Sequence, residues 1–137
     1  MKKVKLALLG LGTVGGGVWE IFQTNKDEII KNSKQEIEIS KILVKDTSKK
    51  RDESIPEDLI TSDFYEILHD KEIDIVVEVI GGIEPAREYI LEAIKAGKHI
   101  VTANKALLAN HGDEIINEAR KYGVDLYYEA SVAGGVP

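Results

Sequence analysis

Short apolar runs alternate along the chain with segments of helical spacing. The first run, residues 4–9, is nearly continuous in apolar side chains, which is typical of a strand buried on both faces of a parallel sheet. A glycine-rich turn follows, and the apolar residues after the turn lie on one helical face: Val14, Val18, Ile21 and Phe22. The start of the chain is therefore predicted to form a strand, a tight turn and an amphipathic helix.

The same alternation continues to the end of the chain. Later apolar runs predict further strands at residues 37–44, 73–80, 99–102 and 126–128. Three helices are predicted between them: one from a capping box at Asp63 and Glu66 to Leu68, one from Pro85 to a stop at Gly97, and one carrying Ile115, Ile116 and Ala119 before Gly123. Residues 45–53 and 129–137 are predicted to be loops.

Strands that alternate with helices favour an α/β fold with a mostly parallel sheet and helices on both of its faces. Because crossovers between parallel strands are right-handed, the doubly wound topology is the leading choice. The length of 137 residues suits a single domain, and 43% apolar residues are enough to bury a core. The final segment, residues 131–137, brings no capping element, so we expect this domain to be cut from a longer protein.

Charge and cysteine content exclude several classes of function. Lys and Arg number 18 against 24 Asp and Glu, and the net charge of −6 argues against a general nucleic-acid-binding protein. The absence of cysteine excludes disulfide bonds, thiolate metal sites and a cysteine nucleophile. Residues 1–9 imitate the start of a signal peptide, but Gly10 and Gly12 interrupt the apolar stretch and no cleavage site follows. No apolar run approaches the roughly 18 residues of a membrane span, so we expect a cytoplasmic protein without membrane or nucleic-acid partners.

The turn after the first strand contains Gly10, Gly12 and Gly15 in the spacing G-x-G-x-x-G. The first glycine permits a tight turn, the second lets a pyrophosphate approach the backbone, and the third lets the helix pack close to the strand. The pyrophosphate would lie on the amides and the positive dipole end at Thr13 and Val14. A strand before the motif and a helix after it are the context of a Rossmann-type dinucleotide-binding fold. The alternative is a glycine-rich turn that only packs against the sheet.

The end of the second predicted strand bears on the choice between NADP and NAD. An acidic residue there accepts hydrogen bonds from the adenosine ribose, whereas a basic residue accommodates a 2′-phosphate. Lys45 lies where the strand stops and predicts phosphate recognition, while Asp46 leaves NAD open. The basic run at residues 49–51 follows. The alternative is a solvated charged loop.

Four further segments together resemble homoserine dehydrogenase. They are residues 77–82 (VEVIGG), 84–86 (EPA), 97–106 (GKHIVTANKA) and 129–137 (EASVAGGVP). Each is short, but their combination and order are specific, and the resemblance extends over essentially the whole chain. It concerns the N-terminal NAD(P)-binding region of that family only. The resemblance implies an oxidoreductase of threonine, methionine and isoleucine biosynthesis, which interconverts L-homoserine and L-aspartate 4-semialdehyde with NAD(P)(H).

The resemblance also implies roles for individual residues of the nucleotide site. It implies that the turn cradles the pyrophosphate through Gly10, Leu11, Gly12, Thr13, Val14 and Gly15. It further implies that Lys45 lies near the adenosine ribose, and that Ile80 and Gly81 line the ribose and nicotinamide side. Lys105, in the Thr-Ala-Asn-Lys segment, is implied to be a catalytic residue that reaches the nicotinamide and the substrate.

Helix physics gives Lys105 separate support. Asn104 is a good N-cap residue and would place Lys105 in the first turn of a helix. A cation there opposes the helix dipole, at a cost of roughly 0.3–1 kcal/mol when exposed. Contact with a ligand explains a lysine at this unfavourable position better than a contribution to stability does. The alternative is a surface lysine whose stem packs on the protein.

The resemblance implies, in addition, a monovalent cation (sodium) held mainly by backbone oxygens of the loop after the last strand. The matching residues are Glu129, Val132, Gly134 and Val136. Glu129 follows a strand at the carboxyl edge of the sheet, where doubly wound folds bind ligands. The alternative for Glu129 is a carboxylate that only orders the glycine-containing loop.

Oxidation of homoserine needs a base that takes the hydroxyl proton while hydride leaves the carbon. In the family resembled, this proton handling, most substrate binding and dimerisation depend on a following domain. We therefore expect this chain to bind nucleotide but to turn over homoserine negligibly by itself, and the full-length protein to be a homodimer. Two alternatives stay open: another semialdehyde or dihydrodipicolinate-type reductase, and a non-catalytic NAD(P)-sensing module.

Overall fold

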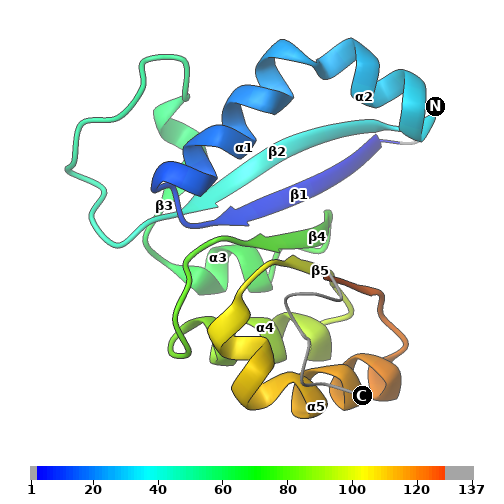
Figure 1. The fold of residues 1–137 in the computed structure, drawn as a ribbon. Helices are drawn as coiled ribbons and strands as arrows, with labels where there is room; N and C mark the ends of the chain where they lie inside the picture. Colours follow the sequence, from blue (N-terminus) through cyan, green and yellow to red (C-terminus); the bar gives the residue numbers. More distant parts are fainter. Residues whose placement is uncertain (1–2, 129–137) are drawn as a thin grey trace.

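In the part of the chain that the computed structural model describes, residues 3–128, six strands form one sheet (Figure 1). They are β1 (Lys3–Leu9), β2 (Glu36–Leu43), β3 (Ile60–Thr61), β4 (Ile73–Glu78), β5 (His99–Thr102) and β6 (Leu126–Tyr127). Their order is β3-β2-β1-β4-β5-β6, and every neighbouring pair is parallel. The chain builds outward from β1 on one side and then, from β4, on the other, which confirms the doubly wound α/β fold.

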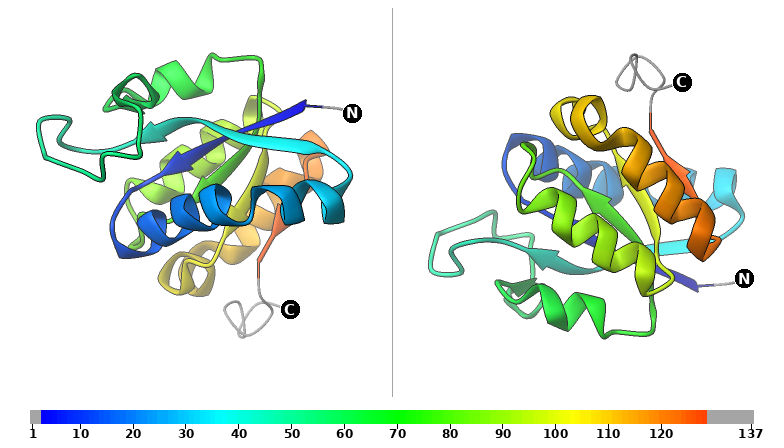
Figure 2. Two further views of the ribbon diagram at one scale, coloured as in Figure 1. Left: turned by 90° about the horizontal axis from the view of Figure 1, so that it is seen from above. Right: turned by 90° about the horizontal axis from the view of Figure 1, so that it is seen from below.

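Helices cover both faces of this sheet (Figures 1 and 2). Their bounds are α1 (Thr13–Thr24), α2 (Lys26–Ser33), α3 (Phe64–Leu68), α4 (Ala86–Lys95) and α5 (Lys105–Tyr122), with a short 3₁₀ helix η1 (Glu57–Leu59). Helices α1 and α2 lie on one side of the sheet, and α3, α4 and α5 lie on the other. Within residues 3–128, none of these helices combines the length and the hydropathy needed to cross a membrane.

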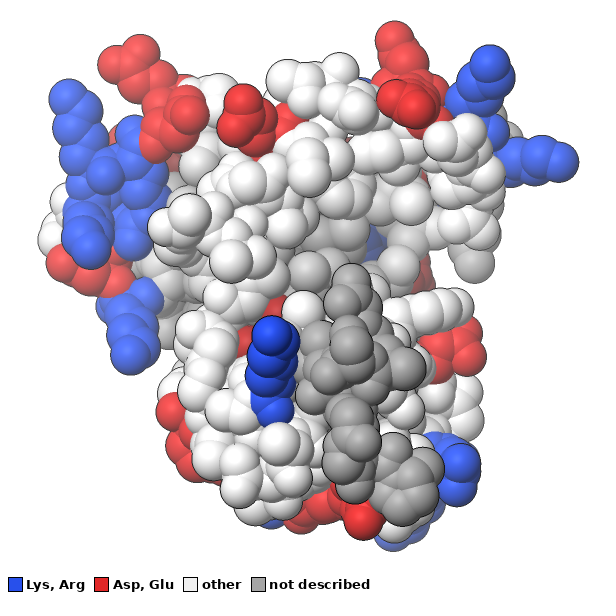
Figure 3. Space-filling view, viewed as in Figure 1, with Lys and Arg blue, Asp and Glu red and all other residues white. Residues whose placement is uncertain are grey.

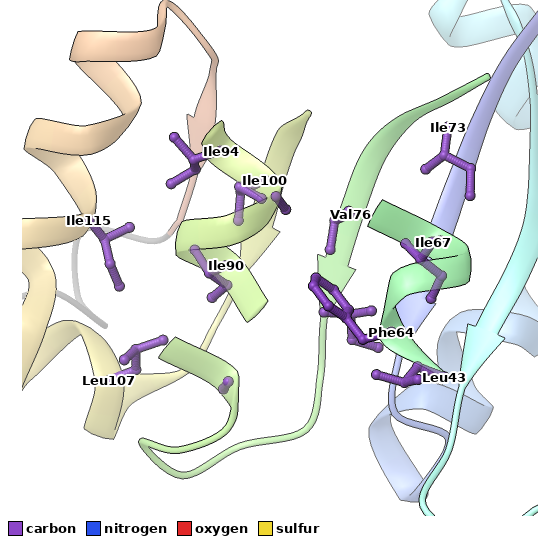
Figure 4. Packing of buried hydrophobic residues seen from close by; sticks show 14 of the residues in the cluster. Leu43, Phe64, Ile67, Ile73, Val76, Ile90, Ile94, Ile100, Leu107 and Ile115 are labelled. Carbon is purple, nitrogen blue, oxygen red and sulfur yellow. The ribbon is translucent and has the colours of Figure 1, made fainter. Parts of the chain in front are cut away.

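The alternation of side chains along β1 divides the core into two layers. Leu6 and Leu8 pack in a cluster with Trp19 of α1, whereas Ala7 and Leu9 belong to the larger cluster beneath α3, α4 and α5. Figure 4 shows much of this larger cluster, with side chains from all three helices: Phe64, Ile67, Ile90, Ile94, Leu107 and Ile115. Because β1 is buried on both faces, its sequence is a nearly continuous apolar run.

Three described elements, α2, η1 and β3, were not predicted from the sequence. No residue of α2 is buried, so the segment carries no apolar stripe that would reveal a helix. Strand β3 has only two residues and pairs with the end of β2 at the edge of the sheet. Such a short strand gives no alternating pattern, and neighbouring structure alone decides its place.

The start of α3 confirms one half of the predicted capping box and corrects the other. The Asp63 carboxylate accepts a hydrogen bond from the amide of Tyr65 at 2.9 Å and is the N-cap. The Asp63 amide, however, donates to the hydroxyl of Thr61 at 3.0 Å, and the Glu66 carboxylate binds that same hydroxyl. Thr61, two residues before the Asp63 cap, therefore replaces the reciprocal bond of a capping box at α3.

At the next helix, α4, the sequence predicted Pro85 in the first turn. The structure places Pro85 one position earlier, as the N-cap.

Candidate functional site

The carboxyl ends of three neighbouring strands meet at Gly10. The Gly10 amide donates to the carbonyl of Leu43, the last residue of β2, at 2.9 Å, and the amide of Val79 donates to the carbonyl of Leu9 at 3.0 Å. Gly10 has a φ of +107°, and a Cβ atom there would lie 3.3 Å from backbone atoms of Val79 and Ile80. The backbone thus adopts the tight turn expected of the first glycine, in a conformation and a space that favour glycine.

The other two glycines of the motif differ in their surroundings. A Cβ atom at Gly15 would lie 2.5 Å from the carbonyl oxygen of Gly10, because α1 packs directly on the turn. A Cβ atom at Gly12 would meet no atom within 4 Å, and Gly12 lines a cleft. Gly15 therefore serves the packing of α1, whereas the backbone at Gly12 is accessible to a ligand.

The N-terminus of α1 is a suitable place for an anion. Gly12 is the N-cap, and among the described residues no side chain caps this helix and no acidic residue lies in its first turn. Thr13 and Val14 are exposed, Val14 at 64%. The first amides of a helix have no acceptor within the helix, and they lie at the positive end of its dipole. An anionic group at Gly12 would meet both the amides and the dipole.

The cleft beside Gly12 has a volume of about 990 Å³ and lies at the carboxyl edge of the sheet. Its walls come from the β1–α1 turn, α1, the end of β2 with the loop after it, and the segment after β4. Of the predicted nucleotide-site residues, five line it: Gly10, Leu11, Gly12, Lys45 and Ile80. The other five predicted nucleotide-site residues do not line the cleft: Thr13, Val14, Gly15, Gly81 and Lys105. The cleft opens where the chain reverses direction across the sheet, between β1 and β4, the place where doubly wound folds bind ligands.

Basic side chains gather on one side of this cleft. Figure 3 shows Lys and Arg side chains on the side of the molecule where the loop after β2 projects in Figure 1. Four basic residues of that loop line the cleft: Lys45, Lys49, Lys50 and Arg51. Asp46 and Asp52 of the same loop also line the cleft, so four basic residues stand against two acidic ones on this wall, although the chain as a whole has a net charge of −6.

Asp46 and Arg51, in the loop after β2, are engaged within the loop itself. The Asp46 carboxylate accepts hydrogen bonds from the Ser48 hydroxyl at 2.6 Å and the Ser48 amide at 2.9 Å, and these bonds hold the pKa of Asp46 below its ordinary value. The Arg51 guanidinium donates to the carbonyls of Asp46 at 2.7 Å and of Lys49 at 2.8 Å. Lys45 is exposed and takes part in none of these bonds within the described loop. Of the two candidate ribose-reading residues, Lys45 is therefore freer to meet a ligand than Asp46.

A buried polar network follows the cleft beyond Ile80, and the sequence did not reveal it. Glu78, the last residue of β4, is only 1% exposed. Its carboxylate accepts hydrogen bonds from the Thr102 hydroxyl at 2.5 Å, the Gly81 amide at 2.9 Å and the Asn104 side-chain amide at 3.4 Å. One signal was present, an acidic residue inside an apolar run of β-branched residues, but its partners are distant in sequence.

Lys105 begins α5, as the sequence predicted. Asn104 is the N-cap: its side-chain oxygen accepts a hydrogen bond from the amide of Leu107 at 3.1 Å. Its side-chain nitrogen donates to the carbonyl of Gly82 at 2.6 Å. Lys105 is exposed. The start of α5 is therefore attached directly to the turn at Gly81 and Gly82 through Asn104, the residue before Lys105.

Comparison with known proteins adds an independent line of information. A family model described as "Homoserine dehydrogenase, NAD binding domain" matches residues 10–129. The chain belongs to this family. The homoserine dehydrogenase of Bacillus subtilis is 45% identical over 137 residues, which cover 100% of this chain and 32% of that protein. The crystal structure of Staphylococcus aureus homoserine dehydrogenase at pH 7.5 matches with a TM-score of 0.89 and 50% identity, covering 98% of this chain and 34% of that one.

The chain thus spans about a third of the length of its homoserine dehydrogenase relatives. The resemblance read from residues 77–82, 84–86, 97–106 and 129–137, over essentially the whole chain, is confirmed. Family membership also favours homoserine dehydrogenase over the other semialdehyde or dihydrodipicolinate-type reductases. The four residues of the predicted cation site, Glu129, Val132, Gly134 and Val136, lie outside the described residues.

Proposed function

We propose that this homoserine dehydrogenase chain binds NADP or NAD in the cleft at the carboxyl edge of the sheet. The observation that carries the proposal is the open backbone at Gly12, where the uncapped N-terminus of α1 meets the cleft. A pyrophosphate needs amide donors, a positive potential and no side chain in its way. The residues from Gly10 to Gly15 provide all three.

The two halves of the dinucleotide would lie on either side of the pyrophosphate. The adenosine half would lie toward Lys45 and the loop after β2, and the nicotinamide half toward Ile80 and Gly81, at the end of β4. The bound nicotinamide supplies the hydride chemistry. The residues of this chain bind the cofactor and orient it, and the glycine motif leaves the place of the pyrophosphate free of side chains.

We infer that Lys45 recognises a 2′-phosphate, so that NADP is preferred to NAD. Lys45 is exposed, lines the cleft and lies among further basic residues of the same loop. The competing residue, Asp46, already accepts two hydrogen bonds from Ser48. A cation at the ribose favours the phosphorylated cofactor, whereas an unengaged carboxylate would favour NAD.

For the whole protein we propose the interconversion of L-homoserine and L-aspartate 4-semialdehyde, with Lys105 as the catalytic residue that this chain contributes. The exposed ammonium of Lys105 at the start of α5 would contact the nicotinamide and the substrate. The base that takes the hydroxyl proton, and most of the substrate site, would come from the two thirds of the relatives' length that this chain does not span. We therefore expect negligible turnover by this chain alone.

Three further parts of the proposal concern the assembled protein and rest on the resemblance. A sodium ion would be bound by oxygens of Glu129, Val132, Gly134 and Val136. The full-length protein would be a homodimer. It would act in the cytoplasm, on small-molecule substrates and without a nucleic-acid partner.

Calorimetric titration of the 137-residue chain with NADP⁺ and NAD⁺, at low and high salt, tests the proposal. We expect NADP⁺ to bind more tightly at low salt and the preference to diminish at high salt, since a phosphate contact with an exposed lysine is screened. If the chain bound neither NADP⁺ nor NAD⁺, the proposal would be contradicted. Appreciable reduction of cofactor by homoserine in the same preparation would contradict the expected inactivity of this chain alone.

A further inference from the structure

Glu78 occupies a position where an acidic side chain is costly. It ends β4 in the middle of the sheet, where Leu9 of β1 is its partner on one side and Thr102 of β5 is its partner on the other. The residue is 1% exposed, and none of the ion pairs among residues 3–128 includes it. A buried carboxylate without a cation must be compensated by hydrogen bonds.

Hydrogen-bond donors surround the Glu78 carboxylate. One oxygen accepts from the Thr102 hydroxyl at 2.5 Å, and the other accepts from the Gly81 amide at 2.9 Å and the Asn104 side-chain amide at 3.4 Å. Short hydrogen bonds to a charged oxygen are stronger than neutral ones and fix the direction of the donor. The carboxylate therefore orients one backbone amide and two side chains at once.

From these groups the network extends to two segments of the site. The Thr102 hydroxyl accepts a hydrogen bond from the backbone amide of Asn104 at 3.2 Å, and the side-chain nitrogen of Asn104 donates to the Gly82 carbonyl at 2.6 Å. Gly81 and Gly82 both have positive φ, +80° and +71°. The turn after β4 and the start of α5, which carries Lys105, are thus held to one another through Glu78 and Asn104.

We propose that Glu78 is a positioning residue for the nicotinamide half of the cofactor site. It holds the Gly81–Gly82 turn and the Lys105 end of α5 in one arrangement, and it does not itself contact the cofactor. The inference rests on the proposed function, because that function places the nicotinamide beside this turn. Binding sites are commonly kept in shape by hydrogen bonds from residues that lie behind those in contact with the ligand.

The substitution Glu78→Gln tests the proposal with little change of shape. An amide nitrogen in place of one oxygen faces either the Thr102 hydroxyl, which must then accept instead of donate, or the Gly81 and Asn104 donors, so in each orientation at least one donor loses its acceptor. We expect the dissociation constant of the 137-residue chain for NADP⁺ to rise about tenfold. For 2′-phospho-ADP-ribose, which lacks the nicotinamide, we expect a change of less than about twofold. Equal weakening for both ligands, or no change for NADP⁺, overturns the proposal.

Two substitutions at Thr102 form a matched pair of variants, to be used if circular dichroism shows that Glu78→Gln does not fold. Thr102→Ser keeps the hydroxyl and is expected to retain the affinity for NADP⁺. Thr102→Val removes the hydroxyl at nearly constant shape and is expected to weaken NADP⁺ but not 2′-phospho-ADP-ribose. Identical affinities of the two variants for NADP⁺ overturn the proposal. A wild-type chain that binds neither ligand contradicts the proposed function itself, so the two failures are distinguishable.

Discussion

The Cβ position of Gly15 lies 2.5 Å from the carbonyl oxygen of Gly10, five residues earlier in the same motif. This approach places the first turn of α1 directly on the turn that leaves β1. The position of Gly12, between them, has no atom within 4 Å. The motif therefore combines a glycine needed for packing with a glycine whose backbone is open to the cleft, and substitutions at the two should affect different properties.

Gly15→Ala is expected to destabilise the fold. Its methyl group would have to displace backbone of the β1–α1 turn, and overpacking of this kind typically costs about 1–3 kcal/mol. Gly17→Ala is the matched control in the same helix, because a Cβ atom there meets nothing within 4 Å. This control should raise the free energy of unfolding by about 0.5–1 kcal/mol, because alanine favours a helix interior over glycine. Urea unfolding of both variants measures the difference, and equal stabilities would show that the approach at Gly15 is easily relieved.

Lys45→Gln is expected to weaken the affinity for NADP⁺ about tenfold and to leave that for NAD⁺ nearly unchanged. The reason is the loss of a charge that only the 2′-phosphate would use. Lys71→Gln removes an exposed lysine that does not line the cleft and serves as the control. Calorimetric titration at low salt measures both affinities. A parallel loss for the two cofactors would remove Lys45 from the role of phosphate reader.

The ion pair between α4 and α5 predicts a pH dependence of stability. The Arg87 guanidinium binds both carboxylate oxygens of Glu114, at 2.7 and 2.6 Å, and holds the pKa of Glu114 below its ordinary value of 4.5. A carboxyl group with a lowered pKa in the folded state stabilises the fold above its unfolded-state pKa, and the contribution is lost as the pH falls through the folded-state pKa. Because both side chains of the pair are partly exposed to solvent, this contribution is small.

Comparison of the wild-type chain with Glu114→Gln checks this dependence. The difference in free energy of unfolding should shrink toward zero as the pH falls below 4.5. Thermal or urea unfolding over this range gives the difference at each pH. A difference that does not vary with pH would show that Glu114 acts through packing alone.

Lys105→Ala, in the full-length protein, is expected to reduce kcat about a hundredfold or more while the cofactor affinity changes little. The magnitude is that of removing one charged or hydrogen-bonding group that acts in the transition state. Because Lys105 is exposed, the fold should tolerate the change. Steady-state kinetics with homoserine, together with calorimetric titration, separates the two effects. An unaltered kcat would instead favour a non-catalytic, nucleotide-sensing role for this chain.

The elements with a strong local signal could be predicted from the sequence. The apolar run of β1, the glycine motif and the apolar face of α1 identify a strand, a turn and a helix in the right order. Asn104 and Gly123 are also local signals: the first caps the start of α5, and the second, with a φ of +68°, caps its end. Each of these features depends on residues within a few positions of one another, so that spacing alone reveals them.

The remainder depends on contacts between distant positions and could not be predicted in this way. Glu78 finds its partners Thr102 and Asn104 at separations of 24 and 26 residues. Lys98 follows a helix-ending glycine, where a lysine is normally solvated. It is only 4% exposed, its ammonium donates to the carbonyls of Asp70 at 2.7 Å and Ile73 at 2.9 Å, and burial lowers its pKa. Only the packed sheet brings these groups together.

Titration of NADP⁺ into the wild-type chain and Gly12→Val tests the proposed pyrophosphate site most directly. Gly12 has a φ of −78°, which valine can adopt, and a side chain there projects into open space. The fold should therefore persist while the valine occupies the place of the pyrophosphate. We predict no measurable NADP⁺ binding by Gly12→Val with a thermal midpoint that falls by only a few degrees, because valine is a poorer N-cap than glycine, alongside a Gly17→Ala control that binds as the wild type does. A Gly12→Val chain that binds NADP⁺ with wild-type affinity would contradict the account.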